Sequence, residues 1–196
     1  MDKMVRAAVL VVLLSVLAGC AGRNFERPRA EAFPLGQTTY AQVVQQLGEP
    51  RTVGDVVTNG QKVKSMTYRY TTTTDMSWQT GVVPVRTLVY YFHNDTLVGY
   101  EFVSSFQSDN TDFDDTKLGA IAKGRTTRAE VMQLLGKPSA AYIPPMVREP
   151  SGEAIGYGYA RREATAPYKF FRKNLRITFD GRDRVAEMDF TTEGKK

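Results

Sequence analysis

Alternating apolar and polar residues predict β-strands along much of the chain. Apolar side chains occupy every second position in residues 88–92, 98–102 and 175–179, as expected for strands with one buried face. Residues 93–95 and 180–183 follow two of these runs and are typical of hairpin turns, and Asn-Gly at 59–60 is typical of another. The pattern therefore predicts antiparallel strands joined by short turns.

A second pattern occurs twice. Residues 36–50 read GQTTYAQVVQQLGEP and residues 124–138 read GRTTRAEVMQLLGKP, and the offset is 88 positions throughout. The two stretches share Gly36/Gly124, Thr38/Thr126, Thr39/Thr127, Ala41/Ala129, Val43/Val131, Gln45/Gln133, Leu47/Leu135, Gly48/Gly136 and Pro50/Pro138. This many identities without a gap indicate an internal duplication.

Each copy predicts a short helix with defined ends. Thr39 and Gln42, and likewise Thr127 and Glu130, have the spacing of a capping box, which satisfies free backbone N–H groups at a helix start. A glycine followed two residues later by proline ends both helices. The G-x-T-T sequence also resembles a phosphate loop, but it lacks the Lys-Ser/Thr that such a loop needs, so capping is the favoured interpretation.

These patterns predict an α+β fold of two tandem repeats. Each repeat is expected to be a short helical segment followed by an antiparallel sheet of about three strands. The first repeat would span residues 35–103 and the second residues 123–196, with residues 104–122 as a polar, acidic linker. Units of this size are marginally stable alone, so the two are expected to pack together or share a sheet.

The start of the chain predicts an export signal and a lipid anchor. A charged start and a 12-residue apolar run at 7–18, too short to span a bilayer, are typical of a signal peptide over residues 1–19. Leu17-Ala18-Gly19-Cys20 has the form of a bacterial lipobox, and Cys20 is the only cysteine in the sequence. Cys20 is therefore expected to carry acyl chains, with residues 20–34 as a polar tether.

The composition argues against several classes of site. One cysteine and one histidine leave no disulfide framework and no usual zinc site, and make a His-based triad improbable. Asp109, Asp112, Asp114 and Asp115 lack the glycine and final glutamate of a calcium loop, so a solvated linker is favoured. The sequence therefore predicts no enzyme, metal, cofactor or small-molecule substrate. Nucleic acid is an unexpected partner for an exported chain.

The order of lipobox, tether, G-x-T-x-x-[Q/E]-V-x-x-x-L-G-x-P motif, aromatic strand and final hairpin resembles the SmpA/OmlA (BamE-like) outer-membrane lipoproteins. With two copies of the motif, the resemblance covers most of residues 35–192. The secreted β-lactamase inhibitor protein is similar in architecture, also has two copies, and binds an enzyme across its concave sheet. The duplication and the extra threonine before Thr39 depart from the single-copy pattern, so only the lipidated Cys20 is carried over as a site residue.

The resemblance implies helices packed on an antiparallel sheet, in a lipoprotein of the bacterial outer membrane that faces the periplasm. It also implies a protein partner there, such as the β-barrel assembly machinery. The leading expectation is a non-enzymatic binding scaffold for outer-membrane protein assembly or envelope integrity. The alternative is an inhibitor or accessory lipoprotein that binds another envelope protein or enzyme through its sheet.

Two groups of residues are candidates for binding. A basic, aromatic segment offers a surface for anionic lipid or an acidic partner, through Arg161, Arg162, Lys169, Arg172, Lys173 and Arg176. Aromatic residues that favour interfaces are Tyr68, Tyr70, Trp78, Tyr157 and Tyr159. The alternative for the first group is a solvated loop, and for the second half-buried strand positions.

Overall fold

The computed structural model describes residues 22–74, 76–149 and 152–194. The predicted signal peptide and Cys20 lie outside these residues. Within the part of the chain that is described, no helix combines the length and apolar character needed to span a bilayer.

The strands of the described chain form one antiparallel sheet. Their order across the sheet is β1-β2-β4-β5-β6-β7-β8-β9, and the short β3 pairs with β7. The strands are β1 (Thr52–Thr58), β2 (Gln61–Thr71), β3 (Val82–Val83), β4 (Val85–His93), β5 (Thr96–Ser104), β6 (Ala140–Tyr142), β7 (Glu153–Glu163), β8 (Phe170–Phe179) and β9 (Val185–Gly194).

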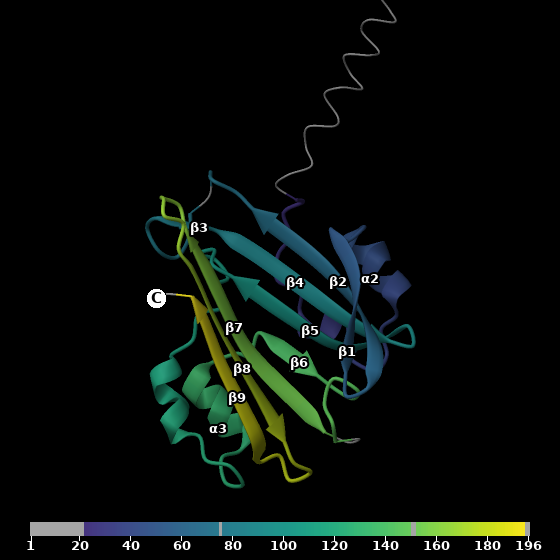
Figure 1. The fold of residues 1–196 in the computed structure, drawn as a ribbon. Helices are drawn as coiled ribbons and strands as arrows, with labels where there is room; N and C mark the ends of the chain where they lie inside the picture. The colour runs from purple at the N-terminus through teal and green to yellow at the C-terminus, as the bar shows by residue number, and fades with distance from the viewer. Residues whose placement is uncertain (1–21, 75, 150–151, 195–196) are drawn as a thin grey trace, which may run out of the picture.

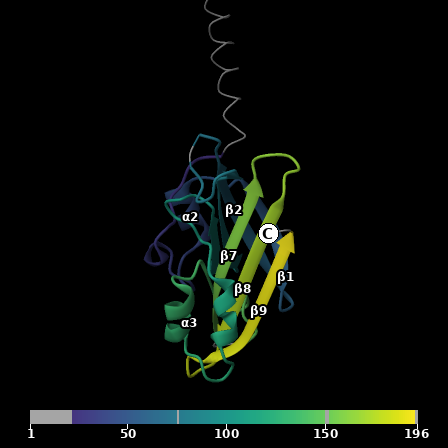
Figure 2. The ribbon, with the colours of Figure 1, turned by 90° about the vertical axis from the view of Figure 1, so that its left-hand side faces the viewer.

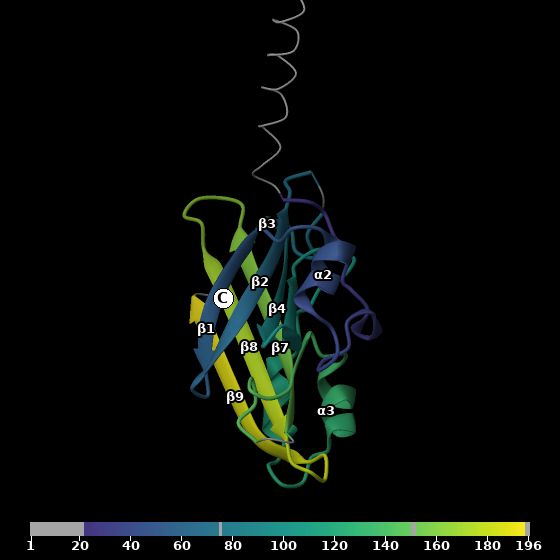
Figure 3. The same ribbon diagram turned by 90° about the vertical axis from the view of Figure 1, so that its right-hand side faces the viewer.

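The sheet curls into a half-barrel with the helices on one side (Figures 1, 2 and 3). The helices among the described residues are η2 (Ala30–Ala32), α2 (Tyr40–Leu47), η3 (Asp115–Ala120) and α3 (Arg128–Leu135). Val43 of α2 packs on residues of β2, β4 and β5, and Val131 of α3 packs on residues of β7 and β8. Both helices therefore cover the same face of the sheet, which leaves the opposite face without a helix.

The predicted α+β fold of two tandem repeats, each a short helix followed by an antiparallel sheet of about three strands, is wrong, because the described strands form one curled sheet. β6 pairs with β5 on one side and β7 on the other, so the strands of both halves belong to one sheet. Small open sheets would leave backbone N–H and C=O groups unpaired at their edges, and joining the sheets through β6 satisfies those groups. A side chain at Gly99 would lie 2.9 Å from the ring of Tyr142, so the glycine permits this close pairing.

The two helix motifs are built alike. In α2 the Thr39 N–H donates to Gln42 Oε1 at 2.8 Å, and in α3 the Thr127 N–H donates to Glu130 Oε2 at 2.8 Å. The reciprocal bonds from the backbone of Gln42 and Glu130 are also present, so both predicted capping boxes are confirmed. The duplicated sequence thus specifies the same local structure twice, although the strands around it form a single sheet.

Segment 104–122, predicted as a solvated linker, makes buried contacts. Arg86, 6% exposed, donates from Nε to Asp109 Oδ2 at 2.7 Å. Phe113 is buried in the core beneath α3. Two of the four aspartates, Asp112 and Asp115, pair with Lys173 at 2.8 and 2.9 Å. This segment therefore ties the two halves of the sheet together.

Acidification is expected to loosen the start of α3 and leave the start of α2 unchanged. Hydrogen bonds from Thr127 lower the pKa of Glu130 below its ordinary value of 4.5. Because the pKa is lowered in the folded state, this stabilisation is complete above the ordinary value and is lost as the pH falls through the folded pKa. Gln42, at the equivalent position, does not titrate. Amide protection factors measured on both helices check this, and Glu130→Gln should abolish the difference.

Candidate functional site

The face of the sheet opposite the helices is hollow and partly open. Gly99, Tyr142 and Ala154 share this face, because they are paired directly across β5, β6 and β7. The next residue along each strand belongs to the paired set Tyr100, Ala141 and Ile155, which faces the helices. The β6–β7 loop crosses one end of the face, where Met146 and Val147 are buried against Val63 and Tyr142. The rest of the face has no covering element in the described chain.

A groove of about 190 Å³ lies on the open part of this face. Residues of β5, β6, β7, β8 and β9 line it, and Figure 1 shows these strands side by side in the sheet. Polar side chains on its walls are Glu101, Arg172, Asn174, Arg176, Asp189 and Thr191. We refer below to this hollow as the groove.

Glycines of β7 form the floor of the groove. A side chain at Gly156 would lie 2.9 Å from Ala140 Cβ, and one at Gly158 would lie 3.0 Å from Val103 Cγ2. Both distances are shorter than ordinary van der Waals contact, so glycine keeps the strands close and the floor low. The hollow therefore follows directly from two glycines in a central strand.

Two arginines of β8 reach into the groove. The Arg176 guanidinium lies 4.1 Å from the ring centroid of Tyr142 and donates to the Met146 carbonyl at 2.7 Å. Arg172 donates from Nε to Asn174 Oδ1 at 3.2 Å. Within the described chain neither arginine forms an ion pair within 4.0 Å, and both are partly exposed. They leave donors available to an acidic or carbonyl-rich ligand.

On the side of the groove formed by β5 and β6, a tyrosine hydrogen-bonds to a carboxylate. The Tyr142 hydroxyl donates to Glu101 Oε1 at 2.8 Å. Burial, followed by the charge of Glu101, raises the pKa of both Tyr142 and Tyr91, so both phenols stay protonated at neutral pH. The wall therefore presents a carboxylate fixed in place by a phenol.

The structure separates the six basic residues predicted to form one surface. Only Arg172 and Arg176 lie in the groove. Lys173 points to the opposite face, is 3% exposed, and donates to the Phe113 carbonyl as well as pairing with Asp112. The remaining three, Arg161, Arg162 and Lys169, lie at the tip of the β7–β8 hairpin. The segment is therefore not one continuous basic patch.

The five candidate aromatic residues also lie in two different places, three in the core and two toward one end of the molecule. Tyr68, Tyr157 and Tyr159 are buried on the helix side, and burial raises the pKa of each to about 12. Tyr68 and Tyr157 donate to the carbonyls that end the two helices, at Gly48 and Gly136. These three side chains therefore belong to the core on the helix side of the sheet.

The other two candidate aromatics lie toward one end of the molecule. Tyr70 stacks on Phe106, with ring centroids 5.7 Å apart. Trp78 is 51% exposed in the loop between β2 and β3. Of the five, Trp78 is thus the one with a largely exposed ring.

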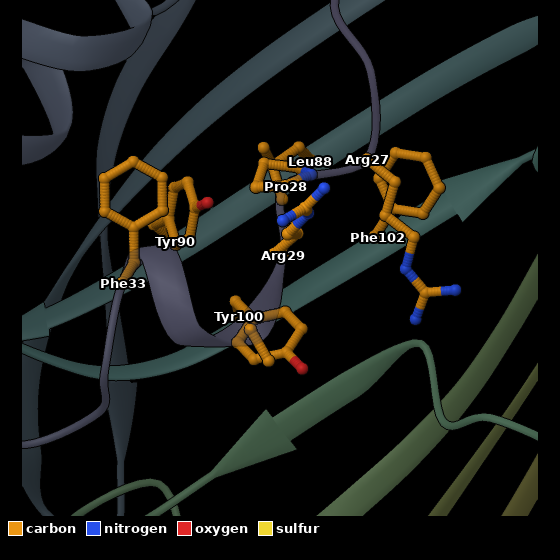
Figure 4. Close-up of a pocket in the computed structure, with 9 residues that line it drawn as sticks. Arg27, Pro28, Arg29, Phe33, Leu88, Tyr90, Tyr100 and Phe102 are labelled. Atoms are coloured by element: carbon orange, nitrogen blue, oxygen red, sulfur yellow. The ribbon is translucent and has the colours of Figure 1, made fainter.

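Residues 22–34, expected to be a tether, pack along the helix side of the sheet. Figure 4 shows the hollow there, in which the Phe33 ring lies beside that of Tyr90, with centroids 5.4 Å apart. The Arg27 guanidinium lies 5.4 Å from the Phe102 ring centroid, and burial lowers the pKa of Arg27 below its ordinary value. The hollow has a volume of about 10 Å³, which holds at most one water molecule.

Sequence reasoning missed most of the groove. Glu101 lies between Tyr100 and Phe102, and Asn174 shares its alternating polar positions with Arg176 and Thr178, so the strand pattern places both away from the core. Tyr142 lies in β6, whose three residues are too few for a periodic pattern. No group of three or more potential metal ligands occurs among the residues that the structure describes.

Comparisons with known proteins give little further information. No protein-family model matches the chain, and no curated protein matches it. Among solved structures, the chain is similar to a candidate β-lactamase inhibitor protein from Streptococcus mutans, with 12% sequence identity and a TM-score of 0.40. The match covers 79% of this chain and 82% of that one. A likeness at this level supports no inference about function, and the resemblance to the SmpA/OmlA family has no support from these comparisons.

Proposed function

We propose that this chain is a non-enzymatic lipoprotein that binds a protein partner in the groove. It would be anchored in the bacterial outer membrane through Cys20 and face the periplasm, with a role in outer-membrane protein assembly or envelope integrity. The observation that carries the binding proposal is the groove itself, an open concave sheet surface on which two partly exposed arginines form no ion pair within the described chain. The lipobox and the duplicated helix motif support the proposed location.

A protein partner fits the groove better than a small ligand. The groove has both signs of charge on its walls, from Arg172 and Arg176 on one strand and Glu101 and Asp189 on others. Protein interfaces combine such partly exposed charges with aromatic side chains, and arginine and tyrosine are enriched in them. Tyr142 beneath Arg176 supplies the aromatic component.

The test is site-specific photocrosslinking in cells that express the full lipidated chain. A crosslinker at Asn174, in the groove, is expected to capture a protein partner, and Arg176→Glu should reduce that capture at least about tenfold, as for a moderate interface hot spot. A crosslinker at Gln45, exposed on α2, is the matched control on the opposite face.

Capture from Gln45 with none from Asn174 would contradict the proposed surface. The identity of the captured protein decides the role. Components of the β-barrel assembly machinery would support the assembly function, whereas a single periplasmic enzyme would support an inhibitor function.

A further inference from the structure

Exposed aromatic side chains gather at one end of the molecule. Trp78 lies in the β2–β3 loop and is 51% exposed. Tyr168 and Phe170 lie in the β7–β8 hairpin and are 61% and 44% exposed. Side chains this large and apolar are usually covered by a partner or a membrane when they cluster at one place on a surface.

The two loops form one structural unit. β3 pairs with the end of β7, and the Ala164 N–H donates to the Gly81 carbonyl at 2.7 Å. Arg161 Nη1 donates to Gln79 Oε1, next to Trp78, at 2.8 Å. We call Trp78, Tyr168 and Phe170 together the aromatic tip.

The described chain begins at the same end. Gly22 lies against β2, where a Cβ on this glycine would be 2.0 Å from the Arg69 carbonyl oxygen. Figures 1, 2 and 3 agree that the start of the described chain, the β2–β3 loop and the β7–β8 hairpin share one end of the molecule. Cys20 precedes Gly22 by two residues, which span at most about 7 Å. An anchor at Cys20 would therefore hold this end at the membrane surface.

The charges around the tip are mostly basic. Arg69, Arg162 and Lys169 are exposed there, and the Arg162 guanidinium lies 5.0 Å from the Tyr168 ring centroid. Among the described residues of the two loops, Glu163 is acidic, and its Oε2 lies 3.9 Å from Lys169 Nζ. Basic side chains are attracted to anionic headgroups, and tryptophan and tyrosine favour the membrane–water interface. The tip combines both features.

We propose that the aromatic tip inserts into the headgroup region of an anionic lipid bilayer and fixes the orientation of the protein on the membrane. This inference rests on the lipid anchor of the proposed function. Arg176 lies six residues beyond Phe170 along β8, about 20 Å farther from the bilayer. Arg172 lies only two residues beyond Phe170, about 7 Å, so one end of the groove would lie near the membrane. The other end, at Arg176, would face the periplasm, where a partner can reach it.

Trp78 makes this testable, because it is the only tryptophan in the chain. The full lipidated protein would be reconstituted into vesicles that contain phosphatidylglycerol, with bromine atoms on the acyl chains as quenchers. We expect Trp78 emission to shift to shorter wavelength, to be quenched by the brominated lipid and to be protected from aqueous iodide. Emission that stays unshifted and remains accessible to iodide would overturn the proposal.

Variants separate the tip from the anchor. Lys169→Gln, which removes one positive charge, is expected to lower the lipid-quenched fraction at low salt about fivefold, which corresponds to about 1 kcal/mol for one basic residue near an anionic membrane. Val57→Ser is the matched control. Val57 is 77% exposed and lies at the end of β1 that is farther from the aromatic tip, so this substitution should not change the quenched fraction. Vesicle flotation reports the anchor in the same samples. If the protein floats with the vesicles but Trp78 is not quenched, the proposal for the aromatic tip is contradicted and the anchor stands. If both flotation and quenching are lost, the tip and the lipid anchor are contradicted together.

Discussion

Lys173→Ala is expected to lower the free energy of unfolding by about 3–5 kcal/mol, the usual cost of removing one partner from a buried ion pair. The Lys173 ammonium is nearly inaccessible and lies 2.8 Å from Asp112 and 2.9 Å from Asp115. It also lies 4.4 Å from the Phe113 ring centroid. Without it, two partly buried carboxylates lose their cation. Urea unfolding followed by circular dichroism measures the change.

Two further variants make the Lys173 result interpretable. Lys173→Met keeps most of the side-chain volume, so a similar loss of stability would show that charge, and not packing, is responsible. Lys169→Ala removes a lysine that is 54% exposed and 3.9 Å from Glu163, and it should change stability by less than about 0.5 kcal/mol. Equal effects of Lys173→Ala and Lys169→Ala would contradict the buried network.

Phe102→Ala is expected to cost about 3–5 kcal/mol and to destabilise both halves of the sheet together. Phe102 is 1% exposed on β5, where it pairs with Leu88 of β4 and packs beneath Arg27. Because β6 joins β5 to β7, the strands unfold as one unit if the sheet is continuous. Trp78 fluorescence and hydrogen exchange at β8 amides should therefore report the same shifted transition.

A control for Phe102 comes from the exposed edge of the sheet. Val57→Ala removes methyl groups that are largely in water, so its effect should stay within about 0.5 kcal/mol. If Phe102→Ala lowered the stability reported by Trp78 fluorescence but left that reported by the β8 amides unchanged, the two halves would unfold independently. That result would contradict a single cooperative sheet.

Local sequence patterns predicted the local structure well. The capping boxes at Thr39 and Thr127 and the turn at Asn59-Gly60 depend on residues within four positions of each other, so the chain specifies them without distant contacts. The Asn59 and Gly60 backbones have the positive φ angles that this turn requires. The same reasoning identified the alternating strands β4 and β8.

The candidate site was harder to predict, because exposure depends on which side of the sheet a residue faces. Arg172, Lys173 and Arg176 lie within five positions, yet the first and last face the groove while Lys173 is buried on the helix side. Period-two alternation separates the two sides of a strand, but it does not say which side an opposing helix covers. Among aromatic residues the same uncertainty left Tyr157 and Trp78 as equal candidates.

The sequence by itself determined the duplicated helix motif, its caps, the longer strands and their hairpins, because each depends on neighbours along the chain. Only the tertiary structure decided that the strands join into one curled sheet, through the three residues of β6, and that the sheet has one open face. Pairing between β5 and β6 joins residues about 40 positions apart. It forms because the backbone N–H and C=O groups at the edges of the two half-sheets need hydrogen-bond partners, and no local sequence pattern specifies which strand supplies them. For the same reason, the groove and the aromatic tip became visible only in the folded chain.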